Sequence, residues 1–221
     1  TPTYLMRVQG PINYSFSSMK LQNIKIANNK ITSPTSSISS FFYLKSIGTF
    51  DLFDAEISRN VIYGSPASES NFRFLTIDGT NKMTAHKISA LNNECQIPIY
   101  LMSIQGLINT KLSNLKLQNI KIANNNITTQ VSSIASFLYM KNVETLDLLD
   151  AKISENVIKG SSPSGTNFTF MNIEATKKIT AEDISALNNE CQIPTYIMSI
   201  QGPNNIELSS LFSSKSIKKK R

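Results

Sequence analysis

Two pairs of carboxylates are the residues of this chain best suited to acid–base chemistry. Asp51 and Asp54 form one pair, and Asp147 and Asp150 form the other. A glycosidase needs two carboxyl groups that face each other at roughly 5 to 9.5 Å. Within each pair the residues are three apart on an extended segment, so their side chains point in different directions. We therefore predict that these aspartates cap turns and do not catalyse hydrolysis.

The single histidine, His86, lacks the partners that a catalytic base requires, and the residue 96 positions later is Glu182. We expect His86 to be a solvent-facing strand residue. No spacing of His, Cys, Asp and Glu indicates a metal centre, and no glycine-rich loop indicates a bound phosphate. The sequence predicts no enzyme, no catalytic residues, no metal and no cofactor.

Three candidate N-glycosylation sequons begin at Asn13, Asn126 and Asn167. The chain is rich in Asn, Ser and Thr, so about this many sequons arise by chance, and they do not by themselves show secretion. If they are used, the protein is exported from the cell.

The net charge of +7 is concentrated at one end, because residues 218–221 (KKKR) supply four positive charges. We interpret this run as a solvated terminus. Aromatic residues are expected in buried columns and not interleaved with lysine on an outer face, which predicts no nucleic-acid partner. No apolar run approaches the roughly 20 residues that span a bilayer, so no membrane span is expected.

The sequence repeats itself without a gap. Residues 2–97 align with residues 98–193 at 59 identities in 96 positions, and a third copy starts at 194. An isoleucine recurs at intervals of 31 or 34 residues, at Ile26, Ile57, Ile88, Ile122, Ile153 and Ile184. This recurrence divides each 96-residue unit into three sub-units of about 32 residues. Such repeats are typical of solenoids, whose units stack on one another.

Each sub-unit carries strand patterns and no helical stripe. Apolar residues alternate, as at Met19 and Leu21, which indicates a strand with one buried face. Four residues that tolerate left-handed backbone mark a bend: Asn23, Asp54, Asn119 and Asp150. The pattern predicts an all-β, right-handed parallel β-helix of about seven coils, three per 96-residue unit. A leucine-rich repeat is the alternative, but it has no place for the aromatic strand that precedes each bend.

Vertical columns of equivalent residues should form the core. Ile57 and Ile88 are expected to be neighbours in adjacent coils. An aromatic column is expected from Phe42, Phe74, Phe137 and Phe170. The segments after each bend are expected to project as a ridge of loops: 30–40, 63–70, 92–98 and their copies. Such loops are either binding elements carried on a rigid scaffold or simple tethers between strands.

Cys95 and Cys191 are too few for a disulfide framework. They occupy equivalent places three coils apart, so their Cα atoms should be roughly 14 Å apart, beyond the roughly 7 Å that a disulfide allows. We expect no bond between them. Both free, buried thiols and pairing with another chain are consistent with the sequence.

The solenoid is expected to occupy residues 1–202. Extension of the 96-residue register places Ser213 where Leu117 stands, so residues 203–221 should form a degenerate last coil and a basic tail. Thr1 is already in repeat register, which leads us to expect that further coils precede it in a longer chain.

The segment TLDLLDAKISENVIKGSSPSGTNFTFMNI (145–173) resembles the Phe-x-x-Asn repeats of polymorphic outer-membrane proteins and their protist relatives in the pectin-lyase-like superfamily. Ile153-x-x-Asn156 stands where these repeats have Phe-x-x-Asn, and GTNFTFM (165–171) stands at the entry to the next strand. The chain departs from the family in lacking its Gly-Gly pair. The resemblance covers nearly the whole chain and implies a parallel β-helix in a surface or adhesive protein.

Three functions are consistent with this sequence. The first is a non-catalytic structural or adhesive segment of a longer extracellular or cell-surface protein, with protein partners, copies of itself or glycans as ligands. The second is a carbohydrate-binding or carbohydrate-active β-helix. The third is an intracellular scaffold in a filament or cytoskeletal assembly. Fold and repeat alone do not separate them, because function depends on the site and not on the fold.

Overall fold

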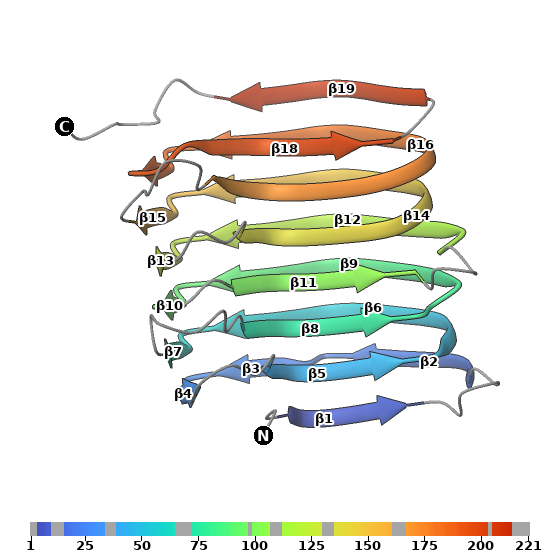
Figure 1. Ribbon diagram of the computed structural model, residues 1–221, viewed down its shortest axis with the longest axis horizontal. Helices are drawn as coiled ribbons and strands as arrows, with labels where there is room; N and C mark the ends of the chain where they lie inside the picture. Colours follow the sequence, from blue (N-terminus) through green and yellow to red (C-terminus); the bar gives the residue numbers. More distant parts are fainter. Residues whose placement is uncertain are drawn as a thin grey trace.

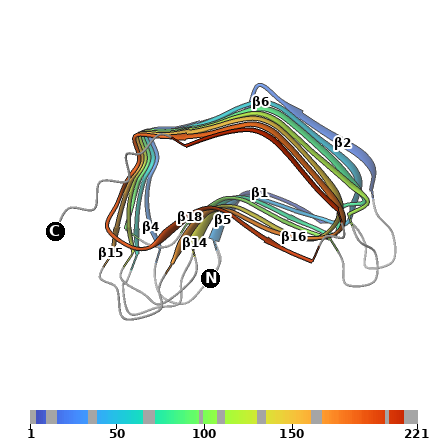
Figure 2. The same ribbon diagram turned by 90° about the horizontal axis from the view of Figure 1, so that it is seen from above.

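The computed structural model shows a parallel β-solenoid with three walls (Figure 1, Figure 2). It describes residues 4–9, 16–33, 39–64, 72–96, 99–106, 112–129, 135–160, 167–202 and 205–213. The described residues form strands, turns and bends, and none of them is helical. Figure 2 is viewed from the C-terminal end, and the chain runs anticlockwise as it rises toward the viewer, so the coil is right-handed.

The first and second walls belong to one 13-stranded sheet, and the third wall is a separate six-stranded sheet. The first wall contains β1 (Tyr4–Gln9), β5 (Ser39–Lys45), β8 (Phe72–Asp78), β11 (Ile99–Gln105) and β18 (Thr195–Gln201). The second wall contains β2 (Phe16–Gln22), β3 (Lys25–Ala27), β6 (Ile47–Ser58), β9 (Lys82–Leu91), β12 (Asn114–Ala123) and β19 (Asn205–Ser213). Two long strands run through both walls: β14 (Ala135–Ser154) and β16 (Phe168–Leu187). The third wall contains β4 (Lys30–Ser33), β7 (Val61–Gly64), β10 (Glu94–Cys95), β13 (Asn126–Thr129), β15 (Val157–Gly160) and β17 (Glu190–Cys191).

Four windings are described without interruption from the first wall to the third, at residues 39–64, 72–96, 135–160 and 167–191. The sequence predicted a total of about seven coils. The levels at 4–33 and 99–129 each include residues outside the described set, and the last level has no described third-wall strand. Every pairing between the named strands is parallel, so each winding lies directly on the one before it.

The predicted bend is confirmed by the backbone. Asn23, Asp54, Asn119 and Asp150 have φ angles of 57°, 53°, 54° and 53°. A second column of positive φ turns the chain from the second wall to the third: Asn28, Arg59, Asn92, Asn124, Glu155 and Asn188. Asn and Asp adopt this left-handed conformation more readily than other residues with a side chain, which explains why they recur there.

The prediction that Ile57 and Ile88 are vertical neighbours is wrong. Ile57 pairs with Ala90, and Ile88 pairs with Ala55 in the winding before it. The predicted register of this third sub-unit is therefore shifted by two residues. The fold survives the error because side chains alternate with a period of two, so a shift of two keeps the same residues facing the core.

Isoleucine misled the prediction because it fills two neighbouring columns in turn. One winding has Ala55 and Ile57, and the next has Ile88 and Ala90. The small residue of one winding therefore lies against the large residue of its neighbour in both columns. All four side chains are at most 5% exposed, so this exchange fills the core between adjacent windings without a change in total volume.

The expected aromatic column is present but starts one residue earlier than predicted. Phe41, and not Phe42, stands over Phe74, with ring centroids 5.4 Å apart. The rings of Phe137 and Phe170 stack with their centroids 5.6 Å apart. Leu101 lies between the two phenylalanine pairs, because Met102, the residue after Leu101, pairs in register with Leu75, the residue after Phe74. Phe41 is 3% exposed, whereas Phe42 is only partly buried at the edge of the core.

A ladder of asparagines, all buried except the half-buried Asn29, defines the true register. Its members are Asn29, Asn60, Asn93, Asn125, Asn156 and Asn189, at sequence separations of 31, 33, 32, 31 and 33. The backbone N–H and side-chain Nδ2 of each member both donate to Oδ1 of the next, as for Asn93 and Asn125 at 3.0 and 2.9 Å. From Asn60 onward, Nδ2 also donates to a carbonyl of the preceding winding. The ladder thus satisfies buried polar groups in pairs of adjacent windings.

The third wall corrects the predicted ridge of loops. Residues 30–33, 61–64 and 94–95 are strands that close the coil, and their inward side chains include Ile62 and Cys95. Among the other ridge residues, 34–38, 65–70 and 97–98 lie outside the described residues. The sequence suggested loops because these strands are only two to four residues long.

The last winding continues the apolar pattern beyond residue 203. Leu208 pairs with Ala181 and so occupies the column of Leu117, the place predicted for Ser213. Ser213 instead pairs with Ala186, in the column of Ile122. The 96-residue register fails here because the chain reaches the column of Leu117 at Leu208, five residues earlier in the sequence than the predicted Ser213. Residues 214–221, which include the basic run, lie outside the described residues.

Candidate functional site

The outward face of the first wall carries the strongest concentration of groups able to bind a ligand. Figure 2 shows that this wall arches toward the lumen. Two columns of outward side chains follow the arch: Arg7, Tyr43, Thr76, Ser103, Tyr139, Asn172 and Ser199 in the first, and Gln9, Lys45, Asp78, Gln105, Lys141, Glu174 and Gln201 in the second. Aromatic rings, hydroxyls, amides and charges are therefore repeated along the axis at the spacing of strands, about 4.8 Å.

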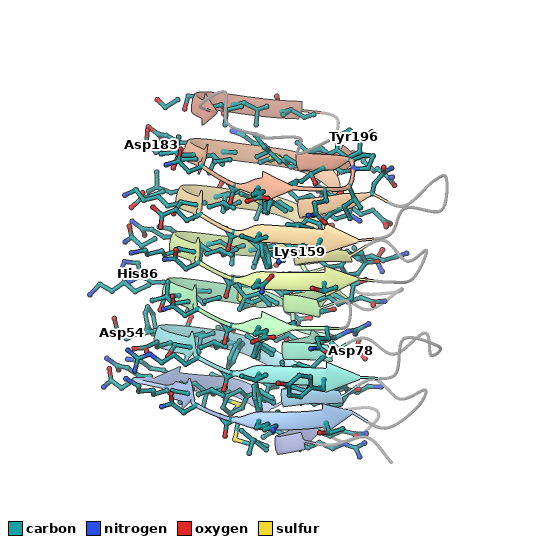
Figure 3. All side chains as sticks on the ribbon, turned by 90° about the vertical axis from the view of Figure 1, so that its left-hand side faces the viewer. Asp54, Asp78, His86, Lys159, Asp183 and Tyr196 are labelled. Carbon is teal, nitrogen blue, oxygen red and sulfur yellow. The ribbon has the colours of Figure 1, made fainter. Side chains whose placement is uncertain are left out.

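Tyrosines give this face its aromatic surface. The rings of Tyr100 and Tyr139 meet edge to face, with centroids 5.7 Å apart. Tyr196 is 53% exposed in the last level, and Figure 3 shows it on the same side of the solenoid as Asp78. Among the residues whose burial is described, the expectation that aromatic residues lie in buried columns is correct for most phenylalanines and wrong for the tyrosines. The tyrosine hydroxyl explains the difference, because it gains from contact with water.

Two arginines lie over these tyrosine rings. The guanidinium carbon of Arg7 is 5.6 Å from the ring centroid of Tyr43, and that of Arg73 is 5.3 Å from the ring centroid of Tyr100. Both distances fall within the range of cation–π attraction. Burial lowers the pKa of Arg73 below its ordinary value, and the neighbouring Tyr100 partly offsets this. Burial likewise raises the pKa of Tyr100, and Arg73 opposes that shift.

A groove of about 270 Å³ opens at the first-repeat end of this face, between the two arginines. Its polar lining consists of Arg7, Tyr43, Arg73, Thr76, Asp78, Ser103 and Gln105. Nζ of Lys45 lies 3.7 Å from the Asp78 carboxylate, and Lys141 holds Glu174 in the same way at 3.4 Å. The acidic groups of this column are thus each paired with a lysine of an adjacent level, so the arginines determine the charge of the groove.

The predicted carboxylate pairs lie on the second wall and not in this groove. Asp54 and Asp150 stand at the bend, where they pair with Lys87 at 3.5 Å and Lys152 at 2.9 Å. Asp51 is separated from Asp147 by two intervening levels, as the register through Thr84 and Lys116 shows. Three levels correspond to roughly 14 Å, which is too far for two carboxyl groups that act on one glycosidic bond.

His86 also lies on the outer face of the second wall, on the side that carries Asp54 and Asp183 in Figure 3. Its ring contacts Phe53 at 6.3 Å between centroids, and its Nε2 is 2.8 Å from Nδ2 of Asn119. Among the described residues, no group of three or more His, Cys, Asp or Glu side chains is arranged to hold a metal ion.

Cys95 and Cys191 are free and buried, in the inward column of the third wall. Burial raises the pKa of both thiols. The prediction that they do not bond to each other is confirmed.

The sequons differ in their settings. Asn126 begins β13, where its Oδ1 is enclosed without a hydrogen-bond partner. Asn167 is half-buried immediately before β16, and Asn13 lies outside the described residues. Nothing in these positions shows whether the sequons are used, so glycosylation stays a prediction.

Comparison with protein-family models gives no match for this chain. Curated protein sequences and solved structures likewise give none. Within the described part of the chain, no helix has the length and apolar character needed to cross a membrane. The molecule is a parallel β-solenoid whose first wall carries tyrosines and arginines on its outer face.

Sequence reasoning missed two features. The tyrosine face had a signal, because Tyr43 and Tyr139 each stand two residues after a buried phenylalanine, Phe41 or Phe137. The ladder also had a signal, because an asparagine closes every sub-unit. Our template followed the isoleucine instead and so chose Asn92 over its buried neighbour Asn93.

Proposed function

We propose that this chain is a non-catalytic structural or adhesive β-helix, part of a longer extracellular or cell-surface protein of the kind that the Phe-x-x-Asn resemblance implies. The first wall supplies the adhesive surface, and the rest of the coil is the rod that presents it. The observation that carries the proposal is the vertical repetition of tyrosine, arginine, hydroxyl and amide side chains on the outer face of the first wall.

The rest of the structure supports the rod. The lumen is filled by one continuous cluster of buried apolar side chains, and the asparagine ladder links neighbouring windings from Asn29 to Asn189. Stability in such a coil is a sum over neighbouring windings. A long, stiff object with repeated surface groups binds through many weak contacts at once, which multiplies its avidity without any single strong site.

The arrangement of the acidic groups supports a non-catalytic role. Asp78 and Glu174 lie on the first wall one to a level, and each is held by a lysine. A hydrolase places two carboxyl groups within about 9.5 Å across one bond. The aspartates that come in pairs along the sequence are on the second wall, where Lys87 and Lys152 neutralise the bend residues.

The proposal is tested by immobilising the chain and measuring retention of a panel of glycans and of soluble copies of the chain, with reducing-end release assayed in parallel. We expect retention of at least one ligand without cleavage, and weaker retention by Tyr139→Ser. Lys116→Thr, on the second wall, is the control and should retain the ligand as the wild type does. Release of new reducing ends, or retention of nothing on the panel, would overturn the proposal.

Carbohydrate binding is the second candidate, and the edge-to-face pair of Tyr100 and Tyr139 favours it. Aromatic rings flanked by amides and hydroxyls suit a sugar, because apolar sugar faces cover the rings while polar groups bond to the hydroxyls. Retention of a glycan that Tyr139→Ser loses would select this candidate. Retention of copies of the chain, with no glycan bound, would select adhesion through protein contacts.

A further inference from the structure

We propose that the groove between Arg7 and Arg73 binds a single oxyanion group: a carboxylate, a sulfate or a phosphate. The inference deepens the proposed function and rests on it for the setting, since the groove lies on the same wall. It adds a ligand chemistry that the tyrosine face alone does not specify.

The two arginines are held ready for such a ligand. Arg7 lies over Tyr43 and donates from Nη2 to Oε1 of Gln9 at 2.7 Å. Arg73 lies over Tyr100, whose ring contacts Tyr139 in turn. The N–H groups of a guanidinium lie in its own plane, where they form the fork that matches two oxygens of a carboxylate, sulfate or phosphate.

Arg73 shows a vacant bonding position. It is half-buried, and its Nε is enclosed with no hydrogen-bond partner in the described part of the structure. Leaving such a donor unpaired is unfavourable, and most buried donors have a partner. An anion in the groove supplies the acceptor. Ser103, which also lines the groove, carries a hydroxyl that can donate to the same ligand, whereas the Thr76 hydroxyl is already hydrogen-bonded to that of Ser40 at 2.7 Å.

The charge of the groove favours an anion. Asp78 is the one carboxylate among its described lining residues, and Lys45 offsets it at 3.7 Å. The described lining of the groove thus carries two guanidinium groups and one carboxylate. A guanidinium group stays protonated in proteins near neutral pH. The groove is thus cationic at its two arginines and neutral around the acidic residue.

The second repeat provides matched controls. Residues 7 and 73 correspond to Ser103 and Thr169, whereas Tyr43 and Tyr100 are retained as Tyr139 and Tyr196. Arg7→Ser and Arg73→Thr therefore introduce residues that the same scaffold already accepts. Arg7 is exposed, so its replacement leaves the core intact.

The experiment is a calorimetric titration of the whole chain with sodium sulfate and with inorganic phosphate at low ionic strength. The wild type should bind one anion per chain. We expect Arg73→Thr to weaken binding about tenfold or more, Arg7→Ser to weaken it several-fold, and Lys116→Thr to leave it unchanged, since a charge-assisted hydrogen bond contributes about a tenfold change in affinity or more. Circular dichroism checks that each variant folds.

No saturable binding by the wild type, or equal binding by wild type and both arginine variants, would overturn the inference even if the chain adheres to glycans. A second arm compares free sulfate with a sulfated disaccharide and a uronic-acid trisaccharide. Tighter binding of either saccharide assigns the anion to a glycan, and equal affinity for free sulfate assigns it to a free ion. Both results support an oxyanion site, and neither depends on adhesion being observed.

Discussion

The two 96-residue repeats have nearly the same interior and different outer walls. Asn60 and Asn156 occupy equivalent rungs of the ladder with hydrogen bonds of the same length to within 0.1 Å. On the first wall, however, Arg7 and Arg73 of the first repeat are replaced by serine and threonine in the second. A solenoid constrains inward residues through their neighbours above and below, whereas each outward residue can change alone. The comparison teaches that specific binding is to be sought where the repeats diverge.

The largest predicted effect tests the shared interior. Asn60→Ala and Asn156→Ala each remove a buried amide that accepts two hydrogen bonds from the preceding asparagine. We expect each to lower the free energy of unfolding by about 2 to 4 kcal/mol, because the backbone N–H and one side-chain N–H of the preceding asparagine lose their acceptor. Urea unfolding measures the loss. Glu155→Gly, at the neighbouring exposed position of positive φ, should be close to neutral, and equal stability of this control and Asn156→Ala would contradict the ladder's role.

A smaller effect is expected at the corner between the first and second walls. Gly202 has φ of +85°, and a Cβ there would lie 2.9 Å from the carbonyl oxygen of Ala175. Gly202→Ala should therefore destabilise the last winding by about 1 to 3 kcal/mol. Ser46 occupies the same corner of the first repeat's second level with φ of 57°, so Ser46→Gly should be tolerated. Hydrogen exchange of β19 measures the local loss, and unchanged exchange in Gly202→Ala would show that the corner relaxes freely.

The buried thiols compare the two repeats directly. Burial raises the pKa of Cys95 and, less completely, that of Cys191, where a hydrogen bond involving Thr195 opposes the shift. Because the thiolate is the reactive form, we expect iodoacetamide to modify Cys191 about tenfold faster than Cys95 in the native chain, a difference of about 1.4 kcal/mol. Mass spectrometry over time gives both rates. Cys191→Ser should leave the Cys95 rate unchanged, and faster modification of Cys95 would reverse the predicted order.

The smallest effect concerns acid stability. Ser58 Oγ donates to Glu56 at 2.6 Å, and this hydrogen bond, followed by the charge of Lys25, holds the pKa of Glu56 below its ordinary value of 4.5. A carboxylate with a lowered folded pKa stabilises the fold above its ordinary pKa, and this contribution is lost as the pH falls through the lowered value. Ser58→Ala should therefore reduce stability at neutral pH and not in strong acid.

The second repeat has Lys152 in place of Glu56, so Ser154→Ala is the matched control and should show no such pH dependence. Urea midpoints measured from about pH 3 to pH 6 cover the relevant window. An equal loss in both serine variants at every pH would assign the effect to packing instead of titration.

The sequence predicted the architecture well because side chains alternate between core and solvent with a period of two along each strand. A register error of two residues therefore leaves the same residues facing the core. Ile57 and Ile88 were wrongly stacked, yet both face the core. The error of one residue at Phe42 was more serious, because it moved the column from Phe41 to a partly buried position. Short third-wall strands such as Glu94–Cys95 were invisible, since two residues carry no periodic signal.

The candidate site was harder to predict than the fold. Tyr100 and Arg73 meet only because strands 27 residues apart pair in parallel. No local pattern records that contact, and a tyrosine in a strand is equally compatible with the core. The unpaired Nε of Arg73 is likewise a property of its three-dimensional surroundings. The sequence could show that residues 7 and 73 differ between the repeats, but not that they share a groove.

The asparagine ladder has a practical consequence for protein engineering. Windings of 31, 32 and 33 residues are joined by the same hydrogen bonds, so the ladder fixes register without fixing winding length. Two different solenoids of this type should therefore be spliced at a ladder asparagine, and a chimera joined there keeps its inward residues in phase whatever the length of its parents' turns.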